Sequence, residues 1–158
     1  MATISIESNG LLEKTAVYYN GQQVGGVKEI FLNLDEEGTF DAIIQYEGAD
    51  KQIYTKQIFS DYLAGIKTVP PAFTEEEAQE LLLFTVESEG DIDTAMVFIN
   101  DEPQEGIVSV FLHIKGTEEQ GGIKSLFSLK KQIPDHPEFV AQITYRNEDD
   151  SIETEDIF

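Results

Sequence analysis

The chain has 158 residues, with 31 acidic and 10 basic side chains and a formal net charge of −21 at pH 7. This charge disfavours binding to nucleic acid or to an anionic membrane surface, because the mean field of the protein repels phosphates. The lack of cysteine excludes disulfides, a thiol nucleophile and cysteine-ligated metals. A hydrophobic content of 41% is sufficient for a packed core.

The sequence also carries information about location. Its first residues lack the basic stretch and apolar run of a classical secretory signal. Its apolar runs are too short to span a bilayer. We therefore expect a soluble protein that is cytoplasmic or contained within a virion or another assembly.

The sequence repeats itself. Residues 4–34 align without a gap with residues 84–114, so that "ISIESNG" meets "FTVESEG". Residues 40–59 align with residues 139–158 with nine identities in 20 positions, where roughly one is expected by chance at average composition. The pattern predicts an internal duplication: copy one at 1–59, a connector at 60–82, and copy two at 83–158, with a 19-residue insertion within 115–138.

Within each copy the hydrophobic period is two, which is typical of β-strands with one buried face. In chain order, the first copy is expected to form strands at 3–8, 15–20, 27–34, 39–46 and 52–58, with equivalents in the second. Asn20-Gly21 is the favoured pair for a type I′ hairpin turn, and Asn100-Asp101 fills the same place in copy two.

The connector interrupts this pattern. Thr74 and Glu77 have the spacing of a capping box, which predicts a short helix at about 75–82. The expected fold is therefore all-β and mainly antiparallel: two tandem copies of a roughly five-stranded meander or sandwich module, with a short connecting helix and one insertion. Because a module of about 57 residues is marginal alone, the copies should pack on each other or on a partner.

The last eight residues, "SIETEDIF", repeat "QIYTKQIF" of copy one. The repeat predicts that Ile157 and Phe158 are core residues of the second copy rather than part of a frayed tail. Their loss should cost several kcal/mol, the typical effect of removing two large buried side chains.

Few residues suggest catalysis. His113 lies on the strand face opposite the core positions and His136 lies in a turn, and neither has a visible partner. The stretch "NLDEEG" at 33–38 resembles an EF-hand loop, but Ile44 stands where the loop needs glutamate. We predict no catalytic, cofactor-binding or metal-binding residues and no enzymatic activity.

The insertion is where the two copies differ most. It concentrates lysines on an otherwise acidic chain and spaces its apolar residues as an amphipathic segment does. The segment either packs its apolar side on copy two or docks another protein or another copy of this chain. The residues predicted for docking are Lys124, Phe127, Lys130 and Lys131.

The hairpin "VYYNGQQVGGVKEI" at 17–30 resembles hairpins that recur in small β-rich phage virion proteins. The resemblance implies a virion- or assembly-associated component. Copy two departs from this pattern, with Asp101 in place of the glycine and Gln104 in place of the valine.

These observations favour a non-enzymatic structural or protein-interaction module that binds a protein partner or itself. One alternative is an acidic mimic of nucleic acid that inhibits a DNA- or RNA-binding protein, which requires carboxylates spaced like phosphates along one face. Another is a small-ligand binder with a closed pocket between the copies, lined by tyrosines such as Tyr19, Tyr46 and Tyr145.

Overall fold

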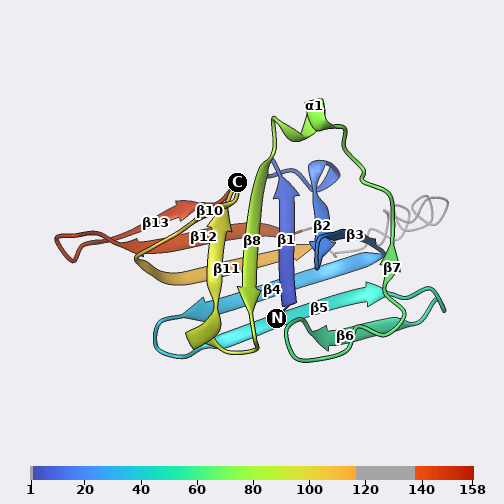
Figure 1. The fold of residues 1–158 in the computed structure, drawn as a ribbon, viewed down its shortest axis with the longest axis horizontal. Helices are drawn as coiled ribbons and strands as arrows, with labels where there is room; N and C mark the ends of the chain where they lie inside the picture. Colours follow the sequence, from blue (N-terminus) through green and yellow to red (C-terminus); the bar gives the residue numbers. More distant parts are fainter. Residues whose placement is uncertain (1, 117–137) are drawn as a thin grey trace.

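The computed structural model describes residues 2–116 and 138–158, which form two antiparallel β-sheets packed face to face (Figure 1). The seven-stranded sheet has the order β10 (Glu102–Pro103), β9 (Met96–Ile99), β8 (Leu82–Ser88), β1 (Ala2–Ser8), β2 (Ala16–Tyr19), β3 (Gln22–Gly25) and β7 (Lys67–Thr68). The six-stranded sheet has the order β13 (Ile152–Asp156), β12 (Glu138–Arg146), β11 (Ile107–Lys115), β4 (Val27–Asp35), β5 (Phe40–Glu47) and β6 (Ile53–Gln57). The prediction of an all-β, mainly antiparallel fold is confirmed.

The strands of the two sheets cross at a steep angle, with β1 and β8 running across β4 and β5 (Figure 1). Between the sheets lies one core cluster, which consists mainly of alternate residues of the long strands. Ile30, Leu32 and Leu34 of β4 and Leu112 of β11 are at most 2% exposed. The period of two in the sequence thus marks the inner face of each sheet.

The centre of each sheet pairs residues that lie 80 positions apart in the chain. Ser5 pairs with Thr85 where β1 meets β8, and Leu32 pairs with Leu112 where β4 meets β11. The strand order of both sheets reads the same from either side of these pairs, apart from the additional β7. The two halves of the chain are therefore related by a pseudo-twofold arrangement, and each sheet contains strands from both halves.

This arrangement is a property of the fold, and its origin by duplication remains a prediction, as do the proposed boundaries at 59 and 83. Each half has a sixth described strand beyond the roughly five expected: β3 and β10, which follow the hairpin turns at Asn20 and Asn100. Both are short strands, and β10 has only two residues.

Two short 3₁₀ turns, η1 (Leu12–Lys14) and η2 (Ile92–Thr94), occupy equivalent places in the halves. The connector contains the predicted helix, α1 (Glu75–Ala78), shorter than expected but with the full capping box between Thr74 and Glu77. No helix among the described residues has both the length and the apolar character to cross a membrane.

The C-terminal residues pack into the core as predicted. Ile157 is 5% exposed and its backbone N–H donates to Ala141, while the ring of Phe158 lies edge-on to Phe84 and Phe139. Ile58 makes the same backbone hydrogen bond, to Ala42, in the first half.

Candidate binding cleft

The residues predicted to dock a partner, Lys124, Phe127, Lys130 and Lys131, lie outside the described residues, as does His136. Their role stays a prediction. The candidate site that follows is built from strands and turns that the structure describes.

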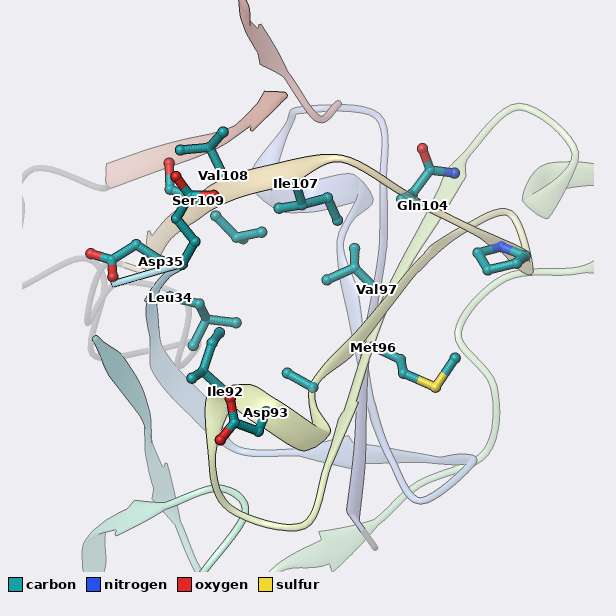
Figure 2. A pocket seen from close by; sticks show the side chains of 14 residues that line it. Leu34, Asp35, Ile92, Asp93, Met96, Val97, Gln104, Ile107, Val108 and Ser109 are labelled. Atoms are coloured by element: carbon teal, nitrogen blue, oxygen red, sulfur yellow. The ribbon is translucent and has the colours of Figure 1, made fainter. Parts of the chain in front are cut away.

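An open cleft of about 430 Å³ lies between the edge of the seven-stranded sheet and the end of β4 and β11 (Figure 2). We call it the acidic cleft. Its floor consists of apolar side chains from both sheets and from η2. They are Leu34, Ile92, Val97, Ile107 and Val110.

The rim of the acidic cleft carries three carboxylates: Asp35, Glu36 and Asp93. Glu36 forms an ion pair with Arg146 of β12. The Asp35 carboxylate accepts hydrogen bonds from the backbone N–H groups of Glu37 and Thr39, at 2.9 and 3.0 Å. These bonds, first of all those from Thr39, lower the pKa of Asp35, so this rim charge persists in mildly acidic solution.

Asp93 is exposed and lies in η2, directly beside the apolar Ile92 (Figure 2). The preceding residue, Asp91, caps η2 by accepting a hydrogen bond from the backbone of Thr94 at 2.9 Å. This cap fixes the turn and therefore the place of Asp93 on the rim.

The pseudo-twofold arrangement gives the cleft a counterpart at the other end of the sandwich, which we call the counterpart groove. It has a volume of about 180 Å³, and its lining residues are equivalent to those of the acidic cleft. Leu12 occupies the position equivalent to Ile92. Likewise, Val17 is equivalent to Val97 and Val27 to Ile107. Two differences between the ends account for the larger volume of the acidic cleft.

One cause is a single residue at the edge of the sheet. Val24 of β3 is 5% exposed and fills the counterpart groove. Its equivalent, Gln104, is polar and only partly buried, and its side chain accepts a hydrogen bond from the hydroxyl of Tyr145 at 3.0 Å. The apolar side chain that narrows the groove is therefore missing from the cleft.

The second cause is the connector. β7 pairs with β3 at one end of the seven-stranded sheet, and the methyl carbon of Val69 lies 2.9 Å from where a Cβ on Gly25 would be. The equivalent of Gly25 is Glu105, whose side chain would meet such a strand. At the cleft end the sheet finishes with β10, where Pro103 offers no backbone N–H for further pairing.

The three tyrosines predicted to line a ligand pocket do not line the acidic cleft. Tyr46 is fully buried, and its hydroxyl donates to the backbone carbonyl of Ala64 at 2.7 Å. Burial raises its pKa, and likewise that of Tyr145. The hydroxyls of Tyr46 and Tyr145 are thus used in hydrogen bonds within the fold.

His113 lies on the outer face of the six-stranded sheet, as its place in the alternation predicted. Its two ring nitrogens lie 2.5 Å from a carboxylate oxygen of Glu29 and 2.6 Å from one of Glu138. The ring thus links β4, β11 and β12. Within the described part of the chain, no group of three or more His, Asp or Glu side chains is arranged to hold a metal ion.

No protein-family model, no curated protein and no solved structure matches this chain. The assignment of function therefore depends on the geometry of the chain itself.

Proposed function

We propose that this chain is a non-enzymatic interaction module that binds a segment of a partner protein in the acidic cleft. The observation that carries the proposal is the difference between the two ends of the sandwich. In the same backbone arrangement, the end with Val24 has a groove of about 180 Å³ and the end with Gln104 has a cleft of about 430 Å³.

The composition of the cleft supports this proposal. Its floor is aliphatic, and two of its side chains, Ile92 and Ile107, are partly exposed, which favours an apolar group of a partner because burying that group removes it from water. A volume of about 430 Å³ is also within the range of small-molecule pockets. A protein segment is the better fit because the cleft is open along an exposed sheet edge.

The other predictions from sequence have no observation of this kind behind them. Association with a phage virion rests on one hairpin pattern, and mimicry of nucleic acid rests on net charge. We carry neither of them forward as a second candidate function.

A library of random peptides displayed on phage tests the proposal. Panning against the wild-type chain should enrich peptides that lose binding to an Ile107→Trp variant, whose indole would occupy the cleft. The matched control is Val27→Trp, the same change in the counterpart groove, which should leave binding unchanged. If no enriched peptide distinguishes the two variants, the cleft is not the binding site.

Both variants must first be shown to fold. A gentler variant, Gln104→Val, gives the cleft the residue that fills the counterpart groove. It should weaken the same peptides without adding a bulky ring.

A further inference from the structure

We infer that the acidic cleft selects a partner segment in which an apolar side chain lies next to a lysine or arginine. This inference rests on the proposed function and names the chemistry of the partner. Charge is distributed differently between the two ends of the sandwich.

Two pairs of equivalent positions differ in charge between the ends, and Asp93 lines the cleft whereas its acidic equivalent, Glu13, does not line the groove. Asp35 on the cleft rim corresponds to Lys115, and Val108 in the cleft lining corresponds to Lys28 in the lining of the groove. Lys67 also lies close to the groove, with its Cε 3.2 Å from where a Cβ on Gly26 would be. The groove thus has Lys28 in its lining and Lys67 beside it, while the cleft lining contains three carboxylates and no base.

Acids next to the lining extend this pattern. Glu102 and Glu105 flank the lining pair Pro103 and Gln104, and Asp91 precedes η2. Arg146 offsets one rim charge through its ion pair with Glu36, which leaves the cleft negative overall. An approaching cation is therefore attracted to this end of the molecule, and an approaching anion is repelled.

The apolar floor and the charged rim are adjacent, which sets the spacing of the partner's groups. Ile92 on the floor and Asp93 on the rim are consecutive residues of η2 (Figure 2). An apolar side chain that contacts Ile92 places a neighbouring lysine or arginine near the Asp93 carboxylate. A segment that has only the apolar side chain, or only the basic one, contacts only the floor or only the rim.

Four synthetic peptides test the inference by isothermal titration at 0.15 M salt. Each carries a central Leu-Phe or Ser-Ser pair, flanked on both sides by lysine or by glutamate. The Leu-Phe peptide with lysine flanks should bind at least about tenfold more tightly than the other three, a difference typical of a few charge and apolar contacts.

Two substitutions of Asp93 test whether its carboxylate is the group that attracts the lysine flanks. Asp93→Asn should weaken the lysine-flanked Leu-Phe peptide about threefold or more, whereas Glu13→Gln, the same change at the equivalent position of the groove, should not. Asp93→Lys should reduce or reverse the preference for lysine over glutamate flanks.

The outcomes separate this inference from the proposed function. Equal affinity for lysine and glutamate flanks, or binding that ignores the Leu-Phe pair, overturns the inference. So does the failure of all four peptides to bind. In each case the proposed function still stands if library peptides lose binding to Ile107→Trp, and it fails if they do not.

Discussion

The two ends of the sandwich share one backbone plan and differ in a few side chains. At the groove end, Val24 completes the core and β7 covers the sheet edge. At the cleft end, Gln104 replaces the valine and β10 leaves the edge uncovered. The difference shows that a few side chains decide how open each end of the same backbone arrangement is.

The comparison also divides the roles of the residues. Residues that are equivalent and buried in both halves stabilise the fold, and their removal should cost the same at either end. Residues that differ between the ends should affect binding and leave stability nearly unchanged. The predictions below test that division, from the largest expected effect to the smallest.

The largest effect is expected at the two buried chain segments that follow β6 and β13. Replacing both Ile157 and Phe158 by alanine should lower the free energy of unfolding by about 4 kcal/mol or more, because large buried side chains leave cavities. Replacing Ile58 and Phe59 should have a similar cost. Urea denaturation measures both, and an unchanged stability for the Ile157 and Phe158 variant would contradict the equivalence of the halves.

A smaller and unequal effect is expected at two equivalent glycines. Gly26 and Gly106 both have positive φ, and a Cβ would lie 2.6 Å from the carbonyl oxygen of Glu47 at Gly26 but 3.0 Å from that of Arg146 at Gly106. Gly26→Ala should cost about 2–4 kcal/mol and Gly106→Ala about 1–2 kcal/mol, from strain and overpacking. Equal costs in thermal or urea unfolding would show that the two ends are packed alike.

The hydroxyls of Tyr46 and Tyr145 should also contribute unequally to the free energy of unfolding. Tyr46→Phe leaves the carbonyl of Ala64 without its hydrogen bond inside the fold and should cost about 1–3 kcal/mol. Tyr145→Phe removes a bond to the partly buried Gln104, which water can replace, and should cost less than about 1 kcal/mol. Unfolding of the two variants side by side in urea checks the order.

The smallest effect is a pH dependence at the cleft rim. The folded pKa of Asp35 lies below its ordinary value of 3.8, so its ionised form adds stability that is present above 3.8 and is lost as the pH falls through the lower folded value. The wild type should therefore exceed Asp35→Asn in urea midpoint near neutral pH. That gap should close at lower pH, and a gap that widens as the pH falls would contradict the hydrogen-bonding of Asp35.

Much of the fold could be predicted from the sequence, because alternation reports burial directly. The period of two in the strand expected at 27–34 predicts one buried face, and its alternate residues Ile30, Leu32 and Leu34 are all buried. The capping box at Thr74 was likewise visible as a local pattern. The register of β1 against β8 could not be predicted from a local pattern, because pairing between distant strands depends on the whole sandwich.

The cleft could not be located from the sequence, although one signal of it was present. Gln104 was recognised as a departure from the hairpin pattern of the first copy, but its meaning depends on Tyr145 and on the β7 strand beside β3. Asp93 gave no signal, since an acid in an acidic loop is unremarkable. The repeat of Tyr46 as Tyr145 favours a tyrosine-lined pocket, whereas in the structure both hydroxyls form hydrogen bonds within the fold.

The most direct test of the account is an NMR titration of the labelled chain with a peptide enriched from the library. Backbone amide shifts should change around Ile92, Asp93, Val97 and Gln104, while the equivalent amides of the groove around Leu12 and Val24 stay in place. Shifts confined to the groove end or to the outer face of the six-stranded sheet would contradict the claim that the open end of the sandwich is the binding site.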